Sequence, residues 1–135
     1  ILGFPGEEEE DVSGLALFLG EARLDWAGFF PFSPEEGTPA AGLPGRVPPG
    51  EAAERVRRLA ARQEEITAER NADQVGRVAQ VLVDRMEAGV PVGRSHREAP
   101  EIDGVILLDR GRPGDWLQAR VTGVYGNDTV AEVVA

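Results

Sequence analysis

Few side chains in this sequence are of a type that does chemistry by itself. The chain has no cysteine, so it can form neither a disulfide nor a thiolate-held zinc or iron–sulfur site. His96 is the lone histidine and has no second imidazole with which to share a metal, so we interpret it as a partly exposed strand or loop residue. Glu35 and Glu36 are adjacent, and adjacent side chains of an extended loop point apart, which favours solvated carboxylates over an acid–base pair. The residue types alone predict no catalytic residue and no metal ligand.

Composition and charge limit the class of protein. The 135 residues, 41% apolar and 28% charged, suit one globular domain or two small ones. No apolar stretch approaches the ~20 residues that span a bilayer, and the first residues lack the features of a signal peptide, so we expect a cytoplasmic protein without a membrane partner. The net charge of −10 disfavours a phosphate-binding surface and indicates either a basic partner or only a need for solubility. Because the chain opens on Ile1, we expect a piece of a longer protein, and we expect it to be a monomer.

The first 32 residues have the pattern of two strands around a helix. Residues 1–2 are interpreted as the tail of a buried strand. Apolar residues then recur with helical spacing over 12–19, after a run of acids that suits a helix N-terminus. The aromatic run 26–32 predicts a second strand, buried on both faces. This order predicts a parallel βαβ unit with a right-handed crossover.

A loop and a long helix are predicted next. Residues 33–50 are rich in proline and glycine, which predicts an ordered loop or linker. Residues 51–71 have helical periodicity, and the i,i+4 pair Glu51–Arg55 is expected to support the solvated face of that helix.

The remaining residues predict a small β-barrel. Short β-rich runs alternate with turn residues, and five strands in so short a stretch favour a closed barrel without exposed edges, which we expect to be antiparallel. Trp116 follows a turn and begins a strand, so we expect it in the core, and the chain then lacks a stacking platform for single-stranded nucleic acid. The expected strands are 77–84, 91–96, 104–109, 116–123 and 129–134.

Three segments carry a family resemblance: GFPGE at 3–7, FFPFSPEEGTPA at 29–40 and GRSHREAPEIDG at 93–104. Together they resemble the C-terminal half of a radical S-adenosylmethionine methylthiotransferase, closer to the branch that modifies a ribosomal protein than to the branch that modifies tRNA. The resemblance implies an α+β fold: incomplete C-terminal (β/α) units of a radical enzyme barrel over residues 1–71, followed by a five-stranded OB-like TRAM barrel over 72–135.

The resemblance also implies a function. The full-length protein would be an enzyme that methylthiolates an aspartate of ribosomal protein S-twelve, with S-adenosylmethionine and two iron–sulfur clusters as cofactors and the TRAM domain docking the protein substrate. This chain alone would be inactive and would bind no cofactor, because it lacks the cluster-binding cysteines. Two alternatives stay open: the equivalent region of a tRNA adenosine methylthiotransferase, and a stand-alone RNA-binding TRAM module.

Site residues follow only from the resemblance. Gly3 and Phe4 would line one side of the S-adenosylmethionine pocket, with Ser33 nearby, although a Gly-Phe-Pro-Gly sequence is also an ordinary strand-to-helix turn. The partner would contact three charged residues of the second half, which could also be plain mixed-charge surface; we expect no specific nucleic acid there. These residues are Arg94, Arg97 and Glu98. The family usually has threonine where Glu8 stands, so another group must satisfy the N–H donors of that helix.

Overall fold

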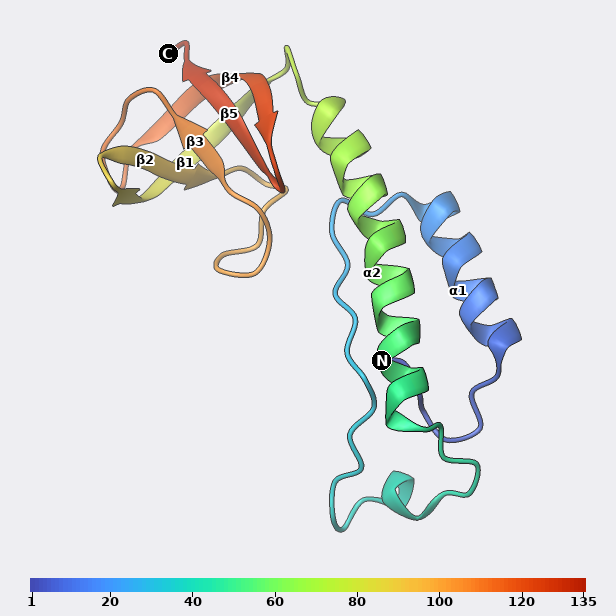
Figure 1. Cartoon of the computed structure of the whole chain (residues 1–135). Coiled ribbons are helices and arrows are strands. Elements are labelled where there is room, and N and C mark those ends of the chain that lie inside the picture. The colour runs from blue at the N-terminus through green and yellow to red at the C-terminus, as the bar shows by residue number, and fades with distance from the viewer. The chain divides into compact units, whose positions relative to one another are not determined.

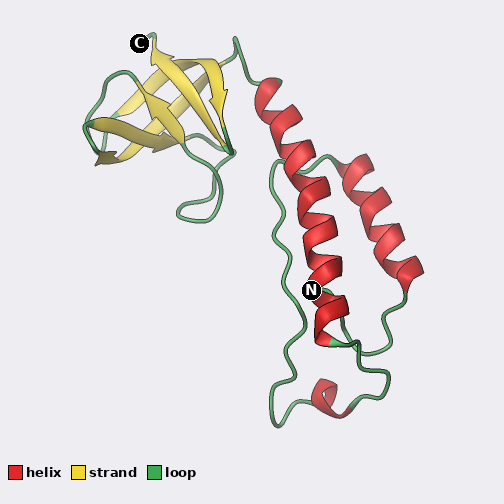
Figure 2. Cartoon of the chain, in the orientation of Figure 1, coloured by secondary structure: helices red, strands yellow, loops and turns green.

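The computed structural model describes all 135 residues and divides them into two compact units. Unit 1 is Ile1–Ile66 and unit 2 is Thr67–Ala135. Figure 1 shows the elements in chain order, and Figure 2 shows that the long helices belong to the first part of the chain and the strands to the second. The elements are α1 (Glu9–Ala22), the 3-10 helix η1 (Pro39–Gly42), α2 (Pro49–Ala72), β1 (Val78–Glu87), β2 (Val90–Arg94), β3 (Ile106–Leu108), β4 (Trp116–Tyr125) and β5 (Asp128–Val133). None of the helices is both long and apolar enough to cross a bilayer.

Helices α1 and α2 lie side by side in unit 1 and enclose its core (Figure 1). The core residues recur three, four or seven positions apart along each helix, which places them on one face. Asp11 contributes one half of a capping box at the start of α1, because its Oδ2 accepts the backbone N–H of the N-cap residue Glu8 at 2.8 Å. The buried residues of this core are Leu2, Val12, Leu19, Leu59 and Ile66.

The expected strand over residues 26–32 is wrong. Only a single parallel bridge joins Leu2 to Pro31, with hydrogen bonds from Leu2 N–H to Phe30 O at 2.8 Å and from Phe32 N–H to Leu2 O at 2.7 Å. The parallel direction is as expected, but Pro31 has no N–H to donate. Phe30 is 67% exposed, so the run is not buried on both faces.

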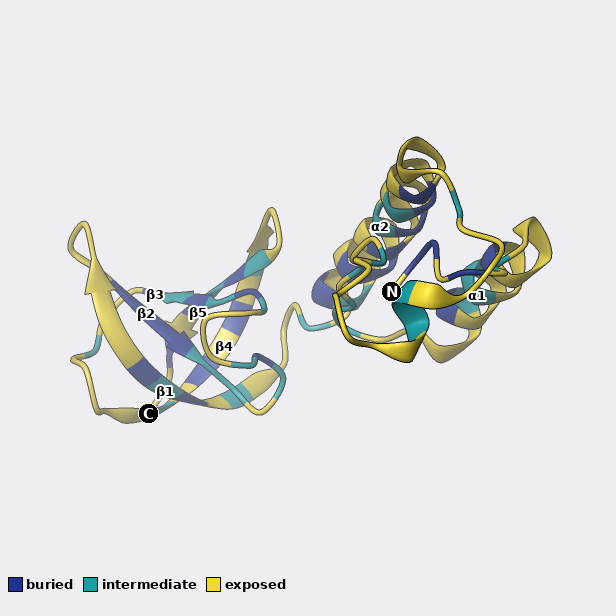
Figure 3. Cartoon of the chain, turned by 90° about the horizontal axis from the view of Figure 1, so that it is seen from below, coloured by how far each residue is buried: buried dark blue, intermediate teal, exposed yellow.

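Unit 2 is a closed barrel with the strand order β1-β2-β3-β5-β4. All five expected strands are present, with ends that differ by a few residues. Alternate residues of β1, β3, β4 and β5 point into the core, whereas β2 has three consecutive buried residues, and Figure 3 shows buried and exposed positions mixed along the ribbons. The core residues are Val81, Val83, Ile106, Leu108, Ala119, Val121, Ala131 and Val133.

The expectation of an all-antiparallel barrel is also wrong, because β3 and β5 pair in parallel. The other four pairings, β1–β2, β2–β3, β4–β5 and β1–β4, are antiparallel. The reason is geometric: strands that alternate in direction around a closed ring must be even in number. A closed ring of five strands therefore needs a parallel pair.

Candidate functional site

A pocket of about 520 Å³ opens in unit 1, a volume in the range of small-molecule sites. Three segments line it: Gly3 and Pro5, residues 31–34, and residues 46–49 with Ala52 and Ala53, where α2 begins. Prolines and other apolar side chains make up most of the wall, and Ser33 and Arg46 are its polar side chains. The chain thus brings residues that are about 30 and 45 positions apart to one hollow.

Gly3 holds the first segment against helix α2. Its φ of 80° is a conformation that glycine adopts without strain, and a Cβ added there would lie 2.6 Å from the Cβ of Ala52. The Gly3 N–H donates to Glu7 Oε1 at 2.9 Å. The backbone at Gly3 can therefore approach both α2 and anything bound in the pocket.

Ser33 lines the same pocket as Gly3, and Phe4 stands beside it. The ring of Phe4 meets the ring of Phe32 edge to face, with centroids 5.3 Å apart and planes at 75°, an arrangement favoured between aromatic rings. Ser33 Oγ donates to Glu35 Oε1 at 2.9 Å, so its oxygen still has lone pairs for a ligand donor. The structure thus gathers the three predicted cofactor-binding residues, although Phe4 stands beside the pocket and reaches it through Phe32.

A buried charge network lies behind the Gly3 turn, and sequence reasoning missed it. Arg55 is 5% exposed and donates to Glu7 Oε1 at 2.6 Å and to Glu51 Oε1 at 2.5 Å. The hydrogen bond that Arg55 donates to the Glu7 carboxylate raises the pKa of Arg55 above its ordinary value, against the opposing effect of burial. The Glu51–Arg55 spacing did indicate an ion pair, and Glu51 is half exposed, but the expectation of a solvated side chain was wrong for Arg55, which also pairs with Glu7 and is buried.

The three predicted partner residues have different environments in unit 2. Arg94 is partly exposed and pairs with Asp84 at 3.1 Å. The Arg97 side chain is 9% exposed and donates to the buried amide of Asn71 at 3.1 Å. The Glu98 side chain is 2% exposed and accepts both the N–H and the hydroxyl of Ser95. Arg97 and Glu98 therefore help to hold the loop in place, and contact of Arg94, Arg97 and Glu98 with a partner stays a prediction.

Trp116 does not lie in the core as expected, because it is 64% exposed. It is the cross-strand neighbour of Leu82, which in turn faces Arg94 on β2, so the three side chains form a row across β4, β1 and β2. With His96, which is exposed, they line a hollow of about 470 Å³. The premise that this barrel lacks an aromatic platform is therefore wrong.

The residues of this chain fit one of the implied cofactor types and not the other. Without cysteine, and with no group of three or more acidic or histidine side chains placed to hold a metal, the chain has no ligands for an iron–sulfur cluster. The expectation that this chain alone binds no cofactor rests on the missing cluster ligands; the pocket at Gly3 nevertheless has the volume, an apolar wall and a small number of polar groups that suit a nucleoside-sized ligand such as S-adenosylmethionine.

Comparison with known proteins gives the family. Residues 75–134 match the model of the TRAM domain. The chain is 50% identical over 127 residues to the ribosomal protein uS12 methylthiotransferase RimO of Moorella thermoacetica, covering 93% of the chain and 28% of that protein. It is 44% identical over 137 residues to the RimO of Nitrosomonas europaea, covering 99% of the chain and 31% of that protein.

A likeness among solved structures is weaker. The solution structure of a conserved protein from Methanococcus maripaludis matches 45% of the chain and 80% of its own length, with 21% identity and a TM-score of 0.38. The chain spans less than a third of the length of the curated relatives described above. The chain is therefore homologous, over nearly all of its residues, to a segment of the radical S-adenosylmethionine methylthiotransferases of the RimO type, and residues 75–134 form its TRAM domain.

Proposed function

We propose that this chain belongs to an enzyme that methylthiolates an aspartate of ribosomal protein uS12. In this proposal unit 1 walls the S-adenosylmethionine pocket and the TRAM domain docks the protein substrate. The observation that carries the proposal is the convergence of two separated motifs, GFPGE and FFPFS, on one pocket of ligand size. The homology to uS12 methylthiotransferases supports the reaction and the substrate.

The residues of the pocket would bind and orient rather than react. Gly3 would let the backbone approach the cofactor, Ser33 would accept a hydrogen bond from it, and the Phe4–Phe32 pair would shield it from water. S-adenosylmethionine, when bound, supplies a sulfonium whose reductive cleavage needs an iron–sulfur cluster. This chain has no cysteine to hold a cluster, so we propose that it is inactive by itself and that another part of the protein supplies the ligands.

Charge is the main support for a protein substrate. Residues 72–135 carry ten acidic residues and seven arginines, and an acidic surface attracts a basic partner with an association rate that falls as salt rises. We expect uS12 to be such a partner, because ribosomal proteins are generally basic. The chain would act as a cytoplasmic monomer, with Arg94 as the accessible contact of the 93–104 loop and with no specific nucleic acid as ligand.

The exposed row at Trp116 favours a second candidate function. An aromatic face beside an arginine is what single-stranded RNA uses for base stacking, which suits the alternative of a tRNA-modifying enzyme or an RNA-binding TRAM module. The row contains one aromatic ring, and the surrounding chain is acidic. We therefore keep the protein substrate as the first candidate.

A titration in one buffer separates the two candidates. Fluorescence of Trp116 in a Trp26→Phe variant would follow binding of purified uS12 and, separately, of a tRNA anticodon stem–loop. We expect tighter binding of uS12, and RNA affinity no better than the ~10⁻⁴ to 10⁻⁶ M of non-specific attachment at physiological salt. Tighter binding of the stem–loop than of uS12 would reverse the choice of substrate class.

A further inference from the structure

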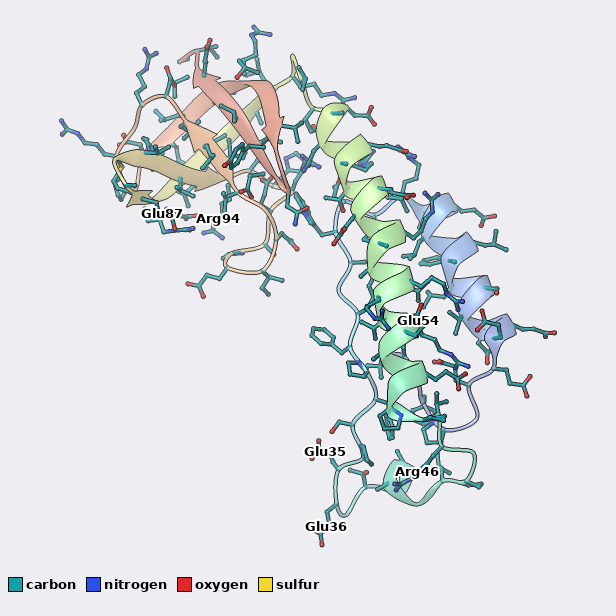
Figure 4. The ribbon with its side chains drawn as sticks, in the orientation of Figure 1. Glu35, Glu36, Arg46, Glu54, Glu87 and Arg94 are labelled. Atoms are coloured by element: carbon teal, nitrogen blue, oxygen red, sulfur yellow. The ribbon has the colours of Figure 1, made fainter.

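Arg46 is the charged side chain among the residues that line the pocket of unit 1. Neither the sequence motifs nor the family resemblance pointed to it, because it stands alone in a loop of prolines and glycines. Figure 4 labels it in the segment between η1 and α2, together with Glu35 and Glu36 of the preceding loop. No carboxylate belongs to the pocket lining, although the chain has 24 acidic residues.

The chain holds Arg46 in place from two sides. Its neighbour Gly45 accepts the N–H of Gly6 at 2.9 Å, which ties the Arg46 segment to the turn that carries Gly3. The guanidinium donates from Nη2 to the carbonyl of Ala41 at 2.5 Å, in the 3-10 helix η1. Arg46 is thus anchored at both its backbone and its head, and its other N–H groups remain able to donate.

Arg46 also differs from the arginines around it in having no carboxylate partner. Arg55, Arg57, Arg58 and Arg62 of helix α2 all form ion pairs with glutamates. The one hydrogen bond of Arg46 is to a neutral carbonyl. Arg46 is exposed, and an anchored guanidinium without a counter-ion, at the wall of a pocket whose other polar side chain is Ser33, is a suitable receptor for a carboxylate, which it can bind with two parallel hydrogen bonds.

We propose that Arg46 is a binding residue that receives the carboxylate of a molecule in this pocket. The inference rests on the proposed function for the identity of that molecule. Two sources have the same chemistry: the amino-acid carboxylate of S-adenosylmethionine, and the aspartate side chain of the protein substrate. Arg46 makes the pocket discriminate between ligands with and without this group, which the apolar wall cannot do.

The test compares ligands that differ in the carboxylate. For the cofactor source, calorimetry measures binding of S-adenosylhomocysteine and of 5′-methylthioadenosine, which keeps the nucleoside thioether but lacks the amino acid. For the substrate source, the pair is a short peptide with a central aspartate and the same peptide with asparagine. We expect the carboxylate form of one pair to bind the unaltered chain about tenfold more tightly, the size of a charge-assisted hydrogen bond.

Three variants complete the test. Arg46→Gln should abolish the tenfold preference for the carboxylate form, and Arg46→Lys should keep part of this preference because a point charge remains. Arg57→Gln is the matched control, since Arg57 is an exposed arginine of α2 outside the pocket, and it should keep the full preference. Circular dichroism melting of each variant confirms that it folds.

The outcomes separate the two proposals. If Arg46→Gln loses the preference for S-adenosylhomocysteine over 5′-methylthioadenosine, Arg46 binds the cofactor. If it loses the preference for the aspartate peptide over the asparagine peptide, Arg46 binds the substrate. If neither nucleoside binds the unaltered chain, the proposed cofactor pocket fails, and the peptide pair alone decides on Arg46. A preference that survives Arg46→Gln, or no preference in either pair, overturns the inference.

Discussion

Adding one methyl group at Gly3 is expected to destabilise unit 1 by two separable effects. The first is backbone strain, because alanine at a φ of 80° costs about 1–2 kcal/mol. The second is overlap with the Cβ of Ala52 at 2.6 Å, and overpacking of this kind typically costs about 1–3 kcal/mol. Gly3→Ala should therefore lower the free energy of unfolding by about 2–5 kcal/mol.

Gly6 offers a matched control within the same turn. Its φ is 89°, but a Cβ there would meet nothing within 4 Å, so Gly6→Ala should show the strain alone, about 1–2 kcal/mol. Ala52→Gly removes the atom with which Gly3→Ala collides, at a cost of about 1 kcal/mol in helix propensity. The double variant Gly3→Ala/Ala52→Gly should be more stable than the sum of the single changes predicts, by about 1–3 kcal/mol.

Urea unfolding provides the assay. In a Trp116→Phe background, Trp26 is the remaining tryptophan and lies in unit 1, so its fluorescence reports on that unit. The midpoint and slope of each variant give the free energies for the cycle. Equal losses for Gly3→Ala and Gly6→Ala, or strict additivity with Ala52→Gly, would refute the close approach to α2 as the reason for glycine at position 3.

Three further predictions concern other parts of the chain. Arg55→Met should lower the melting temperature of unit 1 and weaken binding of S-adenosylhomocysteine, because Glu7 loses the partner that fixes it against Gly3. If the variant binds this ligand as tightly as the unaltered chain does, the charge network is not needed for the pocket. Asn71→Ala should cost unit 2 about 1–3 kcal/mol in chemical unfolding, since Asn71 is fully buried and bonded to both Asn127 and Arg97, and a loss below 0.5 kcal/mol would contradict these bonds. Trp116→Ala should leave the melting temperature almost unchanged, whereas Leu108→Ala, at a buried position, should lower the free energy of unfolding by about 2–5 kcal/mol. A larger loss of stability for Trp116→Ala than for Leu108→Ala would contradict the exposed position of the tryptophan.

The sequence predicted local elements better than their environments. Periodicity located both long helices and all five strands, because the alternation of apolar residues depends only on which face is buried. It failed at residues 26–32, where Pro31 cannot donate to a ladder and a single bridge forms. The parallel pair of β3 and β5 follows from the number of strands in a closed ring, a global property that no local pattern contains.

The site shows the same division. The family resemblance pointed to Gly3, Phe4 and Ser33, which the structure places at or beside one pocket. Burial could not be predicted for Arg55 or Trp116, since each depends on a segment distant in the sequence that either covers the side chain or leaves it open. No sequence pattern pointed to Arg46, because its proposed role depends on three separate segments that meet at the pocket.

The parallel β3–β5 pair also bears on the time course of folding. The β1–β2 and β4–β5 pairs join neighbours in the chain through short turns, and such hairpins form within about 1–10 μs. Strand β3 has three residues, and it must pair with a strand that comes after the whole of β4. Contacts across a longer stretch of chain are slower to form, because the loop entropy is lost before the contacts compensate for it. Both the β3–β5 pair and the β1–β4 pair, which joins residues still farther apart in the chain, are therefore expected to form after the two hairpins.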